Sequence, residues 1–260
     1  GKYNKNTMQH MRSVVFLEEG SECEVLENIV NDTENDLAFT SNVTDINVSK
    51  GASLSFHCFI KGSSNNIHIN NIHGEIHKDS QFNSTTIVKA LGQVRAENRI
   101  NLLAENSSTK IDMLLLGSKD ALLEGLTKVK HAKNNSTSNQ NTRVILNENS
   151  KASFQGKIRV NKEADGTLAN MSCKSLLLSN KARVNSKPEL EILADDVKCS
   201  HGVTVGNLSI EQLFYLRSRG IPEKEARKLL VNSFGNIILD DLNTNFIGRA
   251  KNIMSDYFND

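Results

Sequence analysis

A thiol and an imidazole stand two residues apart at Cys199 and His201, just ahead of the first clearly helical part of the chain. Residues i and i+2 of an extended backbone point to the same face, so this spacing predicts that both side chains reach toward one point. Thiolate and imidazole are ligands of soft metals and of iron–sulfur clusters. Residues two apart on a strand seldom reach the geometry in which a histidine activates a cysteine nucleophile. The pattern therefore favours ligation over covalent catalysis, with a buried cysteine and a hydrogen-bonded histidine as the structural alternative.

A second set of metal-ligand residue types lies upstream, at His57, Cys58, His68, His73 and His77. Stacked on successive strands, such histidines form a ladder that can bind a metal, but no pair has a diagnostic spacing. Exposed or edge histidines on a polar sheet face are the simpler interpretation. The sequence leaves the role of these histidines open.

Motifs of several enzyme classes are absent from the sequence. It holds no G-x-G-x-x-G, no G-x-x-x-x-G-K-[ST], no H-E-x-x-H and no G-x-S-x-G. Asp195 and Asp196 form a carboxylate pair of the kind that polysaccharide lyases use on β-helices, but adjacent residues of a strand point to opposite faces. We therefore expect a protein that is not an enzyme. A β-helix carbohydrate-active enzyme and a purely structural homodimer are the alternatives.

The elements that must position these residues are strand-length runs, rich in β-branched residues, between Val14 and about Val205. Small polar segments of similar composition separate them, mostly at intervals of roughly 30 residues, which is typical of repeat folds. These segments are Glu19–Ser21, Lys50–Ala52, Lys78–Ser80, Glu105–Ser107, Glu148–Ser150 and Asn180–Ala182. Two strands per repeat predict a mainly β fold, a β-helix, over an immunoglobulin-like sandwich or a jelly roll. Ala121–Val129 has the best helical period in this region, and the polar tract His131–Thr142 predicts an exposed loop that leaves the stack.

Beyond the last predicted strand the pattern becomes helical. Ser209 and Gln212 fit a capping box, Gly220 closes the first helix, and two further amphipathic stretches follow. We therefore predict two domains, a β-helix core over residues 1–206 and a C-terminal α-helical domain over residues 207–260. The helices are expected to cap the last edge of the solenoid, although their apolar stripe is wide enough to receive a partner.

Composition argues against several other functions and locations. Lys+Arg 31 against Asp+Glu 30 gives a net charge of +1, which argues against nucleic-acid binding. No apolar run approaches the roughly 20 residues of a membrane span, and the N-terminus is polar, so we expect neither a membrane segment nor a signal peptide. The four cysteines are scattered without a C-x-x-C pair, which predicts a reducing compartment: the cytoplasm, or an organelle stroma in a plastid-bearing source.

Five motifs in the second half of the chain resemble one family closely. They are Ser153–Ile158, Leu176–Ser179, Lys187–Ile192, Ala194–Gly202 and Gln212–Ile221. In this order they look like the SufB/SufD family of the SUF iron–sulfur cluster assembly machinery, and K-C-S-H-G and L-R-S-R-G-I resemble its SufD branch. Val203 stands where the family commonly has alanine, and the helical N-terminal region usual in the family is missing from this sequence.

This resemblance implies a right-handed parallel β-helix with a C-terminal helical domain, acting as a scaffold. It implies pairing with a SufB-type subunit, docking of a SufC-type ATPase on the helices, and a nascent, transient Fe–S cluster between His201 and a cysteine of the partner. Cys199 is the expected helper beside it, and the isolated chain has the option of forming a homodimer. The apolar residues expected to receive a partner are Leu213, Phe214, Leu229, Leu230 and Phe234.

Overall fold

Two parallel β-sheets make up most of the structure, a computed structural model that describes residues 7–31, 37–240 and 242–258. Sheet A has the strand order β1-β3-β5-β7-β9-β11-β13 and sheet B the order β14-β12-β10-β8-β6-β4-β2. The strands of sheet A are β1 (Thr7–Leu17), β3 (Ala38–Val48), β5 (Asn66–Ile76), β7 (Gln93–Leu102), β9 (Leu122–His131), β11 (Lys151–Val160) and β13 (Arg183–Ile192). Those of sheet B are β2 (Glu22–Asn31), β4 (Ser53–Gly62), β6 (Gln81–Ala90), β8 (Ser108–Gly117), β10 (Thr137–Leu146), β12 (Thr167–Leu177) and β14 (Val197–Asn207). The polar residues Gly1 to Asn4, on which the expectation of no signal peptide depends, lie outside the described residues.

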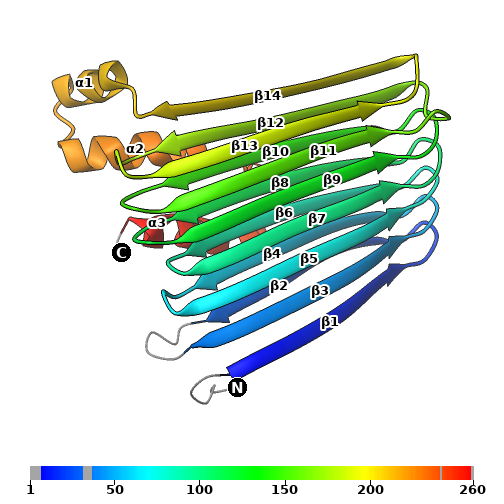
Figure 1. Ribbon diagram of the computed structural model, residues 1–260, viewed down its shortest axis with the longest axis horizontal. Coiled ribbons are helices and arrows are strands. Elements are labelled where there is room, and N and C mark those ends of the chain that lie inside the picture. Colours follow the sequence, from blue (N-terminus) through cyan, green and yellow to red (C-terminus); the bar gives the residue numbers. More distant parts are fainter. Residues whose placement is uncertain (1–6, 32–36, 241, 259–260) are drawn as a thin grey trace.

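The chain alternates between the two sheets and adds one strand to each at every turn. In Figure 1 the odd-numbered strands run in one direction in front and the even-numbered strands return behind as the chain climbs, which is a right-handed coil. Right-handed connections between parallel strands follow from the right-handed twist of strands built of L-residues. The predicted mainly β fold, a parallel β-helix with a C-terminal helical region, is confirmed.

In the first six turns, one corner is held by a residue in the left-handed region of the backbone. These residues are Gly20, Gly51, Asp79, Asn106, Asn135 and Gly166, with φ between 56° and 72°. Their N–H groups bond to the corner one turn further on, as from Gly51 to the carbonyl of Lys78 (3.0 Å) and from Asp79 to that of Glu105 (3.1 Å). Glycine, asparagine and aspartate tolerate this conformation best, so backbone geometry explains the polar segments between the strands.

Inward-facing side chains fill the space between the sheets. Phe56, Phe82 and Phe154 are at most 2 % exposed and belong to one continuous apolar cluster. Close packing leaves no room for a side chain at Gly156, where an added Cβ would lie 2.0 Å from the sulfur of Met171. The solenoid therefore has an interdigitated core along its axis.

Two sequence predictions within the solenoid were wrong. Nearly all of Ala121–Val129 lies in strand β9, and the tract His131–Thr142 forms the end of β9, a corner and the first half of β10. The side chain of His131 is fully buried, with its Nδ1 2.7 Å from the hydroxyl of Ser136 and its Nε2 2.8 Å from that of Ser138. Polar residues enter this core because they can hydrogen-bond to one another there.

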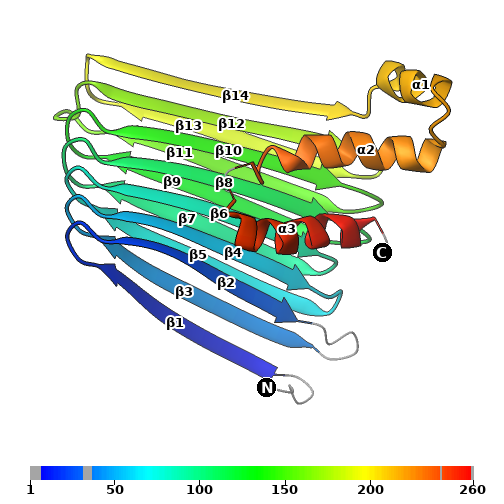
Figure 2. The same cartoon turned by 180° about the vertical axis from the view of Figure 1, so that it is seen from behind.

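Three helices follow β14: α1 (Ile210–Ser218), α2 (Glu223–Asn236) and α3 (Thr244–Tyr257). Figure 2 shows α2 and α3 lying across the outer face of sheet B, so the prediction that they cap the end of the solenoid was wrong. The reason is a second apolar cluster, in which outward-facing residues of sheet B pack against the helices: Phe59, Ile87, Leu114, Leu116, Ile145 and Leu176 with Val231, Ile238, Leu239, Leu242, Ala250, Met254 and Tyr257. In the described part of the chain, no helix has the length and apolarity that crossing a bilayer requires.

Candidate functional site: the open edge of the last strand

Cys199 and His201 lie in β14, the last strand of sheet B. Within the described structure β14 is hydrogen-bonded to β12 on one side and has no neighbouring strand on the other. In the strand register Cys199 lies beside Ala169 and His201 beside Met171, and both neighbours face the interior. Cys199 and His201 therefore share the inward-facing row of the last turn, as their spacing predicts.

The thiol of Cys199 is half-buried at the end of the core, and burial raises its pKa. Cys173 lies one turn earlier, where β12 runs beside Val203, and it is fully buried. Burial also raises the pKa of Cys173, whose sulfur lies 3.6 Å from the hydroxyl of Ser186. The end of the core thus holds two protonated free thiols, of which Cys199 is nearer to solvent.

The imidazole of His201 is exposed although it stands in an inward-facing row. Met171, at the equivalent position one turn earlier, is 1 % exposed, because β14 covers it. Among the residues described, no three His, Cys, Asp or Glu side chains converge as metal ligands. Cys199 and His201 supply two of the donors that a four-coordinate site requires. The edge therefore offers part of a coordination sphere to whatever docks on it.

On helix α1, apolar side chains face solvent. Its N-cap forms as predicted, with the Ser209 hydroxyl accepting from the backbone N–H of Gln212 at 3.1 Å. Phe214 is 71 % exposed, and Ile210 and Tyr215, which sequence reasoning missed, are 83 % and 57 % exposed. Exposed aromatic and aliphatic residues on one short helix are typical of a docking surface.

The other predicted docking residues are partly used by the fold itself. Leu229 is 49 % exposed on α2, whereas Leu213 and Leu230 are half-buried. The Phe234 ring packs on sheet B, with its centroid 5.2 Å from the guanidinium carbon of Arg143. Phe234 therefore attaches α2 to the solenoid and is not a free surface residue.

A groove of about 350 Å³ separates α2 from the ends of the last strands, and a second of about 200 Å³ adjoins it below α1. Leu178 and Leu208 line both grooves and Val231 lines the larger one, while Lys224 and Arg227 add positive charge. The grooves have the chemistry to accept an apolar side chain flanked by acidic ones.

The upstream histidines do not converge on one site. His57 is buried and hydrogen-bonded to a carboxylate, and burial lowers its pKa. Burial lowers the pKa of His68, inside the core, to about 4. His73 lies 3.3 Å from a carboxylate oxygen of Asp45, and His77 is hydrogen-bonded to an asparagine amide at a corner. Each histidine has a separate structural environment.

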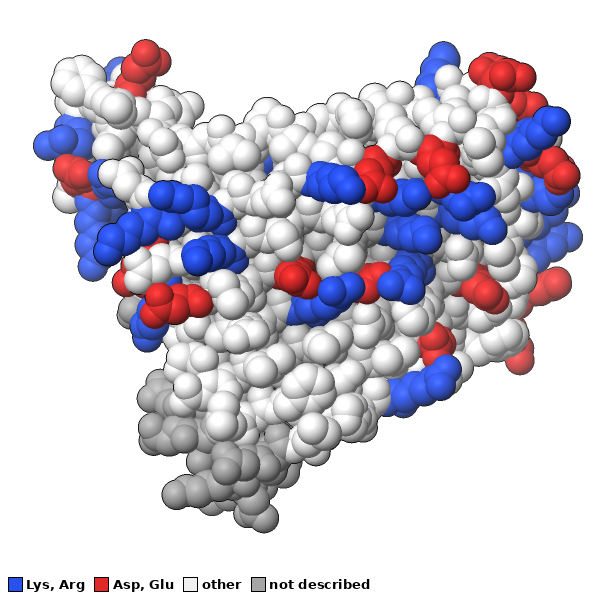
Figure 3. Space-filling model, viewed as in Figure 1, with Lys and Arg blue, Asp and Glu red and all other residues white. Residues whose placement is uncertain are grey.

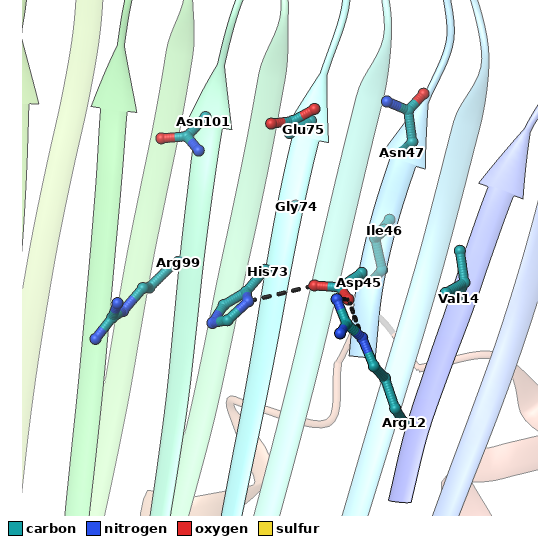
Figure 4. Close-up of a pocket in the computed structure, with 10 residues that line it drawn as sticks. All are labelled: Arg12, Val14, Asp45, Ile46, Asn47, His73, Gly74, Glu75, Arg99 and Asn101. Carbon is teal, nitrogen blue, oxygen red and sulfur yellow. Dashed lines mark hydrogen bonds and ion pairs between the residues drawn. The ribbon is translucent and has the colours of Figure 1, made fainter. Parts of the chain in front are cut away.

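A shallow groove of about 610 Å³ lies on the outer face of sheet A (Figure 4). Asp45 contacts Arg12 at 2.7 Å and His73 at 3.3 Å, and the guanidinium holds the pKa of the carboxyl group below its usual value. An ionised, paired carboxylate is a poor general acid. The other acidic pair, Asp195 and Asp196, lies exposed in the turn before β14 and not on a strand.

The fold is a parallel β-solenoid whose last strand presents a cysteine and a histidine, residue types that can ligate soft metals. Residues 2–234 match the family described as SUF system FeS cluster assembly, SufBD core domain. The chain therefore belongs to the SufBD family, and the resemblance drawn from its five motifs is confirmed.

Within that family the chain is similar to SufD proteins. It is 34 % identical over 227 residues to the iron–sulfur cluster assembly protein SufD of Escherichia coli K12, covering 86 % of this chain and 53 % of that protein. It is 31 % identical over 243 residues to the chloroplastic protein ABCI7 of Arabidopsis thaliana, covering 93 % and 51 % respectively. The chain thus spans about half the length of these two relatives.

Proposed function

We propose that this chain is a SufD-like scaffold subunit that assembles iron–sulfur clusters together with a SufB-type subunit and a SufC-type ATPase. His201 binds the nascent cluster, a cysteine of the SufB-type partner completes the site, and Cys199 assists from the same row. The cluster is cargo that leaves the complex, and the chain itself catalyses no reaction. The relatives are bacterial and chloroplastic, which supports a cytoplasmic or plastid location.

The observation that carries the proposal is the exposure of His201 on an inward-facing row beside an unpaired strand edge. An exposed edge can accept a strand from another chain through backbone hydrogen bonds. Neighbouring strands lie about 4.8 Å apart, so a cysteine on the matching row of a partner strand comes within reach of the imidazole. Such pairing would also bring the half-buried Cys199 close to the partner's cysteine, so that several soft donors would lie near one point.

The helical region supports a second contact, with the ATPase. Phe214 and Leu229 expose apolar surface there, next to the basic-rimmed grooves. Phe234 connects α2 to Arg143 of β10, two strands from the edge strand in sheet B. We propose that ATP hydrolysis by the docked SufC-type subunit moves the helices and thereby opens the paired edge, which exposes the ligands.

The test is cluster assembly by the co-purified complex. We expect His201→Ala in the complex with SufB-type and SufC-type subunits to lower bound iron and acid-labile sulfide at least about tenfold, because a ligand is lost. The matched control is His73→Ala, which removes a half-buried imidazole from the outer face of sheet A. Equal cluster content in wild type and His201→Ala would refute the ligand assignment.

The alternatives make different predictions for the isolated chain. A structural homodimer predicts a doubled mass that a SufB-type subunit does not displace, measurable by light scattering. A carbohydrate-active enzyme predicts glycan cleavage by the chain alone. The proposed scaffold predicts a heterodimer in the presence of the SufB-type subunit and no glycan turnover.

A further inference from the structure

We propose that the outer face of sheet A docks an acidic segment of a partner protein on a cationic patch formed by Arg99, Lys128, Lys130, Lys157 and Arg159. The patch lies on the opposite side of the solenoid from α2 and α3, which cover sheet B (Figures 1 and 2). Figure 3 shows Lys and Arg side chains gathered across the middle of this face. The patch is separate from the open edge and from the helices, so the proposal goes beyond the function proposed above and does not depend on it.

Strand register builds the patch. Arg99 of β7 lies beside Lys128 of β9, which lies beside Lys157 of β11, and two residues further along Lys130 lies beside Arg159. With about 4.8 Å between strands and about 7 Å between alternate residues, the five Cα atoms fit within roughly 10 by 7 Å. Like charges directly opposite each other destabilise a sheet. Since the residues between them face the core, all five side chains point outward and packing does not require their charge.

Only part of this charge is compensated within the chain. Arg99 is paired with a neighbouring glutamate, Lys157 contacts Glu191 (2.7 Å) and Glu189 (4.0 Å), and Glu191 also contacts Arg159 (3.4 Å). Over residues 7–31, 37–240 and 242–258, neither lysine of β9 has a carboxylate within ion-pair distance. The buried Nε of Arg159 has no acceptor either. The centre of the patch therefore keeps both positive charge and unused hydrogen-bond donors.

The surroundings of the patch favour a short acidic protein segment as its occupant. Carboxylates at i and i+2 of an extended chain are about 7 Å apart, which matches the separation of the two cationic rows. Glu75 borders the patch toward β5, so a long polyanion would meet repulsion at that end. From β7 to β11 neither row carries Phe, Tyr or Trp, the side chains on which nucleic-acid bases stack.

The test uses fluorescein-labelled hexaglutamate as the probe and the full chain as the receptor. We expect anisotropy to report binding at about 20 mM salt that weakens on approach to physiological salt, because screening shortens the Debye length to about 8 Å. Zero-length carbodiimide cross-linking followed by mass spectrometry should join the probe to Lys128 and Lys130. Charge reversal in Lys128→Glu/Lys130→Glu should weaken binding at least about tenfold.

The matched control is Lys174→Glu/Lys251→Glu, which changes the net charge equally at exposed residues of β12 and α3. The control should bind the probe within about twofold of wild type, and circular dichroism should be unchanged in both variants. Equal weakening in the two double variants would overturn the proposal in favour of a net-charge effect. Cross-links concentrated on Lys224 and Lys228, beside the α2 groove, or no binding at low salt, would overturn it as well.

Discussion

The inner turns and the last turn of the solenoid use the same inward-facing positions in opposite ways. In the inner turns a polar side chain is enclosed, as with His131, which lies between two serine hydroxyls and whose pKa burial lowers to about 4. In the last turn His201 occupies the same kind of position and is exposed. The two histidines differ because a further strand covers His131, whereas none of the described strands covers His201.

Coverage by the next strand distinguishes a structural histidine from an accessible one in this solenoid. The imidazole of His131 has both ring nitrogens within hydrogen-bond distance of serine hydroxyls, so neither is available to a metal. An imidazole on an uncovered edge keeps a nitrogen available to a partner. The closed turns and the open turn should therefore respond differently to mutation, acid and alkylation.

The largest effect should come from the closed core. Phe154→Ala removes a ring that is 1 % exposed, and we expect it to lower the free energy of unfolding by about 3–5 kcal/mol, through lost burial and a cavity. Urea denaturation followed by circular dichroism measures this. The control is Phe214→Ala, at a ring that is 71 % exposed, which should change stability by less than about 0.5 kcal/mol. Similar losses in both variants would contradict the expected difference.

The next largest effect should be a loss of folding stability in acid, caused by the enclosed histidines. Burial lowers the folded-state pKa of His68 and His131 to about 4, below the ordinary 6.5. Above pH 6.5 both states are neutral; between pH 6.5 and 4 the unfolded chain takes up protons that the folded chain does not. The free energy of unfolding should therefore fall over this window, by up to about 3 kcal/mol per histidine.

The measurement for this pH effect is urea denaturation at several pH values between 7.5 and 4. His131→Gln keeps the ability to hydrogen-bond to the flanking hydroxyls but cannot be protonated, so it should reduce the slope of stability against pH. An unchanged slope in this variant would show that His131 does not carry the effect.

Thiol alkylation rates should also differ between the last turn and the closed turn before it. Cys23 is exposed and Cys199 half-buried, whereas Cys58 and Cys173 are buried. With iodoacetamide at pH 8 and peptide mass spectrometry, we expect Cys199 to react at least about tenfold faster than Cys173, which requires local opening. Comparable rates would mean that the last turn is open one strand deeper than the structure describes.

The smallest effect should be that of His201 on stability. His201→Ala removes an exposed side chain, so the free energy of unfolding should change by less than about 0.5 kcal/mol in urea denaturation. His131→Ala, at an enclosed position, should cost about 1–3 kcal/mol because it leaves buried hydroxyls unpaired. A large loss on His201→Ala would indicate a structural role for this histidine.

The corners explain what the sequence could and could not predict. Five of the six predicted polar segments contain a residue in the left-handed region, namely Gly20, Gly51, Asp79, Asn106 or Glu148. The last two predicted segments join an even-numbered strand to the next odd-numbered one, so they lie at the opposite corner of the turn. The corner residue Asn135 was not recognised, because it lies within the polar tract that was interpreted as a loop. Polarity alone did not distinguish an exposed loop from a strand whose hydroxyls and amides are enclosed, since that depends on partners contributed by the neighbouring turns.

The sequence by itself determined the repeat and the shared face of Cys199 and His201, because both follow from local backbone geometry. It also determined the family, through motifs confined to short segments. Only the tertiary structure decided that α2 and α3 cover sheet B and leave β14 open, because the outer face of that sheet carries a buried apolar surface assembled from five strands. His201 stays accessible because the helices pack on sheet B and not on this edge, and no local sequence pattern predicts that placement.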